Sequence, residues 1–276
     1  MEKMKAVEDS KKEMSSINSI EIVIDETVNA IYKASDVGLL EMMASRLVSL
    51  GYDSSTMIQN HSFLYAPGND PMAVVAHVDT VFARKPDRII SVDGSWFSSF
   101  DDENMYLGLG GDDRSGVYII WRLLDLGHKP FVILLNDEEI GCIGAREFVK
   151  QVKCPDIKYL IEFDRHGGDE AVYYGCDNKK FERYVKHHGF HTEIGRFSDI
   201  GIIAPAWGVA AVNVSIGVHG EHEPMEHVIA SEVESIIEKA DKMLWNVPKK
   251  PYKYIKAKGY VPFLSLYSTW GNNEYF

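Results

Sequence analysis

Acidic and imidazole side chains recur along this chain directly after apolar runs or in glycine-rich turns. Carboxylates and imidazoles without a thiolate suit zinc or a similar divalent ion, with cobalt and manganese as alternatives. Two such ions, with one glutamate left free, would come close to a complete hydrolytic centre. The candidates are His77, Asp79, Asp112, Glu138, Glu139, Asp164 and His222.

The motif AHVDT predicts a metal-binding histidine with its supporting carboxylate. His77 would bind the ion, and Asp79, two residues on, would accept the other ring proton and orient the imidazole. An isolated pair of this kind is more often a structural histidine. The assignment therefore depends on the other motifs.

The glycine-rich stretch GLGGDDRSG, residues 108–116, places Asp112 ahead of a helix. A carboxylate that bridges two cations can hold them about 3.5–4 Å apart, as in two-metal sites. Taken alone, such a stretch is more often a surface turn and helix cap.

The stretch NDEEIGCIGA, residues 136–145, follows the apolar run FVILLN. Two adjacent glutamates at a strand end point in different directions. Glu139 is predicted to bind metal, and Glu138 to stay free as the general base. A bare pair of glutamates is usually a solvated face, but the preceding apolar run makes that reading less suitable here.

Two later motifs supply the remaining candidates. IEFDRHGG puts Asp164 at a strand end, and GVHGEHEPMEH contributes His222. His219 stays open as an alternative ligand or a substrate-side residue, and Glu226 as a support for the ligands. Arg165 and His166 would line the pocket or pair with carboxylates. KHHGFH, residues 186–191, is interpreted as a solvated segment because no carboxylate partner follows at ligand spacing.

The elements that must position these side chains form a βαβ pattern. Short apolar runs at 72–77, 131–136, 158–163 and 208–217 predict buried parallel strands, and 115–127 and 144–152 predict helices between them. The expected fold class is α/β, a three-layer αβα arrangement with a mostly parallel, twisted central sheet and helices on both faces. Ligands of such sheets gather outside the carboxyl ends of the strands, where the candidates fall.

The rest of the chain divides by composition. Residues 1–17 are expected to be flexible, 18–246 to form a single catalytic domain, and 247–276 to be an aromatic and basic extension that packs on the domain or on a partner subunit. Helices are expected between residues 20 and 50, with Asp36 capping the second, and at 231–245. Residues 62–66 are expected to form a strand.

The composition of the chain limits the kinds of binding partner and the cellular setting that are expected. The net charge of −12 disfavours nucleic acid and anionic membrane. Three cysteines without a CxxC motif fit neither a disulfide framework nor a thiolate zinc site, which favours a reducing, cytoplasmic setting. No signal-peptide pattern and no apolar run of about 20 residues is present.

Taken together and in this order, the motifs resemble the dizinc exopeptidase superfamily. Its members include peptidase T, the aminoacylase and carboxypeptidase group, and the bacterial leucyl and glutamyl aminopeptidases. The resemblance spans about residues 70–230 and also includes FSDIGIIAPAWGVAAVNVSIG, where an SD pair precedes the strand leading to the last ligand.

The resemblance implies a specific ligand arrangement. One metal would take His77, Asp112 and Asp164, and the other Asp112, Glu139 and His222. Asp112 would bridge the two ions, and its peptide bond to Asp113 would be cis.

The spacing also bears on the branch of this superfamily. Some relatives insert a lid or dimerisation domain of roughly a hundred residues between the last two ligands. Only 58 positions separate Asp164 from His222, so the resemblance favours the aminopeptidase-like branch without a lid, and C-terminal specificity is not expected.

The function expected from these motifs is hydrolysis of amide bonds in a small peptide, as an aminopeptidase. A deacylase acting on N-acyl amino acids would use the same dimetal centre and stays an alternative. A non-catalytic binding protein of the same fold is a third reading, disfavoured because such a protein needs no free base at Glu138. Self-association through the aromatic tail is left open.

Overall fold

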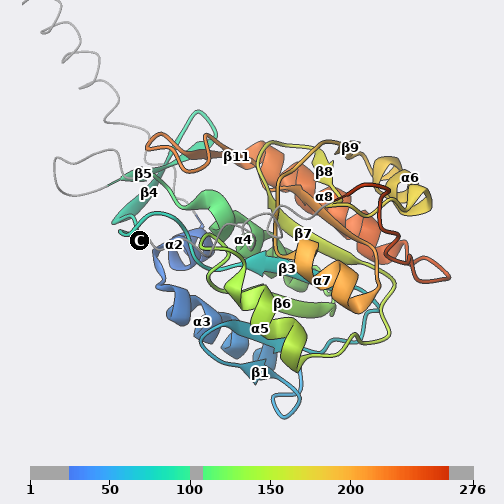
Figure 1. The fold of residues 1–276 in the computed structure, drawn as a ribbon. Helices are drawn as coiled ribbons and strands as arrows, with labels where there is room; N and C mark the ends of the chain where they lie inside the picture. The colour runs from blue at the N-terminus through green and yellow to red at the C-terminus, as the bar shows by residue number, and fades with distance from the viewer. Residues whose placement is uncertain (1–24, 100–107, 261–276) are drawn as a thin grey trace, which may run out of the picture.

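A central sheet runs through the protein, between two layers of helices (Figure 1). The computed structural model describes residues 25–99 and 108–260. The sheet has eight strands in the order β1-β2-β6-β3-β7-β10-β8-β9, and its four middle strands are parallel. In sheet order the bounds are β1 Ile58–Gln59, β2 Phe63–Ala66, β6 Phe131–Leu135, β3 Ala73–His77, β7 Leu160–Arg165, β10 Ala211–Ser215, β8 Glu170–Val172 and β9 His191–Thr192.

The middle strands are buried on both faces because alternate side chains enter two separate cores. Val74 of β3 and Leu134 of β6 pack into one core, whereas Val75 and Leu135 pack into the other. This explains why these strands are continuous apolar runs in the sequence rather than alternating patterns. The predicted α/β fold with a mostly parallel sheet is confirmed.

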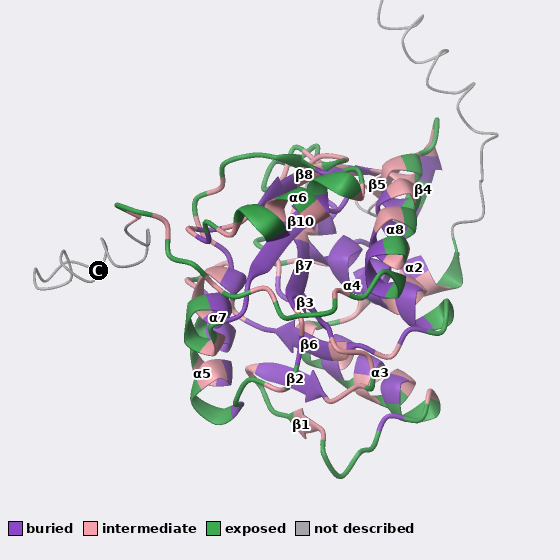
Figure 2. Ribbon diagram, turned by 90° about the vertical axis from the view of Figure 1, so that its right-hand side faces the viewer, coloured by how far each residue is buried: buried purple, intermediate pink, exposed green. Residues whose placement is uncertain are grey.

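Helices cover both faces of the sheet, as Figure 2 shows by their buried inner sides. Side chains of five helices join the first core: α2 Glu26–Lys33, α3 Asp36–Ser49, α4 Gly111–Asp125, α6 Lys179–His187 and α8 Ala230–Trp245. Two helices supply the second core: α5 Ile143–Gln151 and α7 Ile200–Trp207. Helix α7, which was not predicted, lies between the SD pair and β10.

Helix α3 begins one residue away from the predicted cap. Its N-cap is Ser35, whose hydroxyl accepts a hydrogen bond from the Gly38 N–H at 3.1 Å. Asp36, the expected cap, is instead the first helical residue, and its carboxylate pairs with Arg114 and Lys85. The hydroxyl fits the cap position, which leaves the carboxylate available for tertiary contacts.

A second, antiparallel sheet was not predicted. Its strands are ordered β11-β12-β5-β4, with bounds Val218–His219, His227–Ile229, Ser95–Ser99 and Arg88–Val92. Strands β4 and β5 form a hairpin whose turn residues Asp93 and Gly94 both have positive φ, 49° and 79°. Asp-Gly is the common two-residue hairpin turn, so the sequence did carry a signal for this element.

The described part of the C-terminal extension packs on its own domain. The Tyr252 N–H donates to Lys158 O at 2.8 Å, and the Ala210 N–H donates to Tyr252 O at 2.8 Å. Contact with a partner subunit stays a prediction. Residues 1–17 and 261–276 lie outside the described residues.

None of the described helices is long and apolar enough to cross a membrane. The three cysteines are free thiols.

Candidate metal centre

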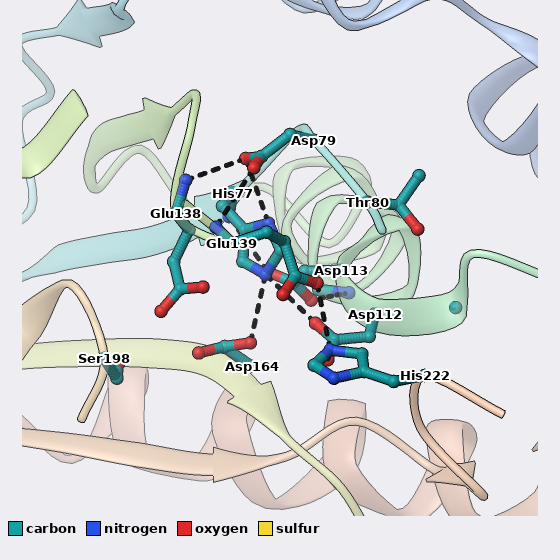
Figure 3. Close-up of polar contacts among 12 residues, drawn as sticks. His77, Asp79, Thr80, Asp112, Asp113, Glu138, Glu139, Asp164, Ser198 and His222 are labelled. Atoms are coloured by element: carbon teal, nitrogen blue, oxygen red, sulfur yellow. Dashed lines mark hydrogen bonds and ion pairs between the residues drawn. The ribbon is translucent and has the colours of Figure 1, made fainter. Parts of the chain in front are cut away.

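The candidate side chains converge at the carboxyl ends of the central strands (Figure 3). His77 is the last residue of β3, Asp164 is the penultimate residue of β7, and Glu138 and Glu139 follow β6. Neighbouring parallel strands end at the same edge of the sheet, so these residues meet although they are distant in sequence.

His222 reaches this edge by a different route from the one predicted. It does not follow the end of β10 directly but lies in the loop between β11 and β12 of the small sheet. Its φ is +64°, a left-handed conformation that is uncommon outside glycine. The small sheet therefore places His222 at the edge of the large sheet where the other candidates lie.

The first group comprises His77, Asp112 and Asp164. His77 Nε2 lies 3.0 Å from Asp112 Oδ1 and 3.2 Å from Asp164 Oδ1. The side chains of His77 and Asp164 are 2% and 10% exposed, so this group is shielded from water.

The second group comprises His222, Asp112 and Glu139. His222 Nε2 lies 3.2 Å from Asp112 Oδ2 and 3.1 Å from Glu139 Oε1. Asp112 thus turns one oxygen toward each imidazole. The structure brings together all five side chains that the sequence selected as ligands, with Asp112 between the two groups.

The donor spacing fits a tetrahedral divalent ion. Bonds of about 2.0–2.1 Å to nitrogen and oxygen place neighbouring ligand atoms of a tetrahedron roughly 3.3 Å apart. The nitrogen–oxygen distances in both groups are 3.0–3.2 Å. The residues present therefore fit a pair of ions that share one carboxylate.

Asp113 also lies within ligand distance of His77 and Asp164, but its oxygens are occupied. Its Oδ2 accepts the His77 N–H and its Oδ1 the Gly116 N–H, both at 2.9 Å. The Asp112–Asp113 peptide is cis, as the resemblance implied, and the two side chains have different environments. Asp113 therefore uses both of its oxygens to hold the backbone of β3 and of α4.

Asp79 has a wider role than the sequence indicated. Its Oδ1 lies 3.3 Å from His77 Nδ1, consistent with the expected orientation of that imidazole. The same carboxylate also accepts the backbone N–H groups of Glu138 and Glu139, each at 3.1 Å. Asp79 therefore fixes the end of β3 against the loop after β6.

Two further residues hold the ligand candidates in place. Glu226 is buried and accepts the backbone N–H groups of Gly111, at 2.5 Å, and His222, at 3.3 Å. Asn213 of β10 donates to Asp164 Oδ2 at 3.2 Å. The sequence suggested a supporting role for Glu226, but Asn213 gave no signal because it sits within an apolar run.

The clustered carboxylates favour the positively charged form of the two histidines. Hydrogen bonds to Asp112 and Glu139 raise the pKa of His222 to about 11. Burial opposes a charge on His77, but Asp112 and Asp164 outweigh it and raise its pKa well above the usual value. Such a field favours a bound cation.

Glu138 belongs to neither donor group, but its buried side chain lies next to them (Figure 3). Among the described residues, its carboxylate accepts a single long contact, from the Cys142 thiol to Oε1 at 3.5 Å. Burial, and then the charge of Asp164, raise the pKa of Glu138 to about 9. A carboxyl of this kind can hold or release a proton next to the ligand groups.

The five ligand candidates and Glu138 lie at or beside one cavity of about 640 Å³, lined in part by Asp112, Glu138, Glu139, Asp164 and His222. His219 pairs with Glu232 at 2.7 Å and is not among the residues that line this cavity. Its two alternative roles, as a ligand or as a substrate-side residue, stay predictions. Arg165 and His166 line the cavity and pair with carboxylates, so both alternatives for them hold.

The segment KHHGFH runs from the end of α6 into β9, and none of its residues is among those that line the cavity. His191 does have carboxylate neighbours, Asp169 at 3.1 Å and Glu193 at 3.6 Å, but all three side chains are about half exposed.

Comparisons with known proteins give a fold and no family. No protein-family model and no curated sequence matches the chain. The aminopeptidase PepT from Bacillus cereus has a TM-score of 0.61 and 13% identity, over 79% of this chain and 96% of that one. A tripeptidase from Staphylococcus aureus has a TM-score of 0.64 and 12% identity, over 79% and 95%.

A leucine aminopeptidase precursor from Bacteroides thetaiotaomicron has a TM-score of 0.55 and 16% identity, over 81% of this chain and 94% of that one. At these identities the likeness concerns the backbone. The chain therefore has the fold of these three structures.

Proposed function

We propose that the protein is a metal-dependent hydrolase of amide bonds, an aminopeptidase that acts on small peptides. The observation that carries the proposal is the pair of donor groups that share Asp112, with Glu138 free beside them. The fold neighbours named as aminopeptidases and as a tripeptidase support the substrate class.

His77, Asp112 and Asp164 would hold one divalent ion, and Asp112, Glu139 and His222 the other. When bound, the ions would supply Lewis acidity for the substrate carbonyl and lower the pKa of water. Zinc is the expected metal, and cobalt or manganese would suit the same donors.

The chain's own residues would manage the protons. Glu138 would take a proton from the attacking water and return it to the leaving amine nitrogen. Nearby cations would lower the pKa of Glu138 and so favour the ionised carboxylate that a general base needs. Asp79 would hold Glu138 in place through its backbone N–H.

The test compares wild-type protein with Glu138→Gln after reconstitution with zinc, cobalt or manganese. The substrates are amino-acid amides, dipeptides and N-acetyl amino acids. We expect the wild type to hydrolyse amides and dipeptides. Glu138→Gln should lose activity by about 100-fold or more, the contribution of a general base, while elemental analysis shows unchanged metal content.

The matched control is Glu41→Gln, which removes the same charge from the exposed face of α3. Hydrolysis of N-acetyl amino acids alone would favour the deacylase. Full activity in Glu138→Gln would remove Glu138 from the proposed role, and absence of bound metal in the wild type would remove the centre itself.

A further inference from the structure

Besides the ligand candidate His222, three basic side chains line the cavity, and two of them are paired with glutamates. Arg165 Nε donates to Glu170 Oε2 at 2.9 Å. His166 pairs through Nδ1 with Glu221 and lies 3.5 Å from Glu170 through Nε2. These two groups therefore have little capacity left for a charged ligand.

Arg196, the third basic residue, is different. It is exposed in the connection between β9 and α7 and lines the same cavity. Within residues 25–99 and 108–260, no hydrogen bond or ion pair reaches its guanidinium. An arginine left without a partner is notable in a chain whose net charge is −12, because acidic partners are plentiful.

The backbone that carries Arg196 is anchored to the strand that carries Asp164. Two residues after Arg196, the Ser198 hydroxyl donates to the buried carboxylate of Glu162 on β7. The Ile200 N–H also donates to Glu162, at 3.3 Å. The backbone of Arg196 is therefore held in place relative to the ligand groups, while its long side chain can reach into the cavity.

The chemistry of the cavity assigns its two sides to different parts of a substrate. The ions would occupy the part of the cavity lined by Glu139 and Asp164, whereas a guanidinium binds a carboxylate through two parallel hydrogen bonds. Arginine remains charged at all physiological pH values. A volume of about 640 Å³ is in the range of small-ligand pockets and suits a short peptide.

We infer that Arg196 binds a carboxylate of the substrate, so that the protein prefers short peptides that carry a negative charge. This inference rests on the proposed function for its substrate class. The carboxylate is either the free C-terminus of a dipeptide or an acidic side chain, and both would meet the same guanidinium.

The experiment measures kcat/KM of the metal-reconstituted protein on two matched pairs of substrates. Leu-Gly is compared with Leu-Gly-amide, and Glu-Gly-amide with Gln-Gly-amide. The wild type should prefer the charged member of one pair. Arg196→Gln should reduce that preference about 10- to 100-fold, mainly through KM, the range for a hydrogen bond to a charged group. Arg196→Lys should restore part of it.

The control is Arg183→Gln, which removes an exposed arginine from α6, away from the cavity. It should leave both preferences and the metal content unchanged. Loss in the first pair identifies the C-terminal carboxylate, and loss in the second pair the side chain. Unchanged ratios in both pairs for Arg196→Gln would overturn the inference.

A binding measurement separates this inference from the proposed function. The affinities of the same peptides for metal-loaded Glu138→Gln protein, with and without Arg196→Gln, can be measured by calorimetry. Arg196→Gln should weaken binding of the charged peptide only. A wild type that hydrolyses none of the peptides would defeat the proposed function, yet the calorimetric ratio would still decide the role of Arg196, and equal affinities would overturn it.

Discussion

Asp79 offers the sharpest test of how the centre is held together. Its two oxygens accept the N–H groups of Glu138 and Glu139, and Oδ1 also lies 3.3 Å from His77 Nδ1. Asp79→Asn keeps the shape but leaves one acceptor oxygen. The new amide group must then face one of the backbone N–H groups, so that a buried donor loses its partner.

The expected cost follows from these contacts. A hydrogen bond to a charged group contributes about 1.5–3 kcal/mol, and an unpaired buried donor costs a comparable amount. Asp79→Asn should therefore lower the free energy of unfolding of the metal-free protein by about 2–4 kcal/mol. Loss of the orienting group behind a metal-binding histidine should also lower metal affinity about 10- to 100-fold.

The pH dependence of this effect has a defined sign. Burial raises the pKa of Asp79, but His77 and the two backbone N–H groups outweigh it and lower the pKa below 3.8. The stabilising contribution is therefore complete above the unfolded-state pKa and is lost as the pH falls through the lower folded-state value. The unfolding free energies of wild type and variant should differ by a constant amount near neutrality and converge in acid.

The assay is urea unfolding in the presence of a chelator, followed by metal titration. The control is Asp156→Asn, which removes the same charge from a side chain that is 93% exposed. A variant at Asp79 within about 0.5 kcal/mol of wild type, the usual range for surface substitutions, with unchanged metal affinity would refute this account.

Two further predictions concern the ions and the helix that carries Asp112. Addition of a divalent ion at about 100 times its Kd should raise the free energy of unfolding by about 2.7 kcal/mol, and a chelator should reverse the rise in Tm. A Tm that does not depend on metal would contradict the proposal that these residues bind metal. Gly116→Ala should destabilise by about 3 kcal/mol or more, because its Cβ would lie 2.1 Å from Phe163 O and 2.3 Å from Asp113 Oδ1. Gly201→Ala, whose Cβ would meet Tyr174 at 3.6 Å, should cost far less in the same unfolding measurement.

The local sequence pattern of apolar runs was sufficient to predict the central sheet of the fold. The apolar runs predicted the four central strands because a strand covered on both faces is apolar at most of its positions. The antiparallel small sheet was missed because β11 and β12 have only two and three residues, and β4 and β5 are partly exposed rather than continuous apolar runs. The Asp93–Gly94 turn nevertheless marked one of its hairpins. The loop between β11 and β12 carries His222.

The sequence by itself determined which side chain types gather at the strand ends, because strand direction and residue order place them there. Only the tertiary structure decided which partner each carboxylate oxygen of these side chains contacts. Asp112 faces two imidazoles, whereas its neighbour Asp113 is occupied by backbone N–H groups. Likewise, Arg165 pairs with Glu170, whereas Arg196 has no such partner among the residues that the structure describes. These differences depend on contacts between segments far apart in the chain, and the pairing of a charge with a distant partner leaves no trace in its local sequence.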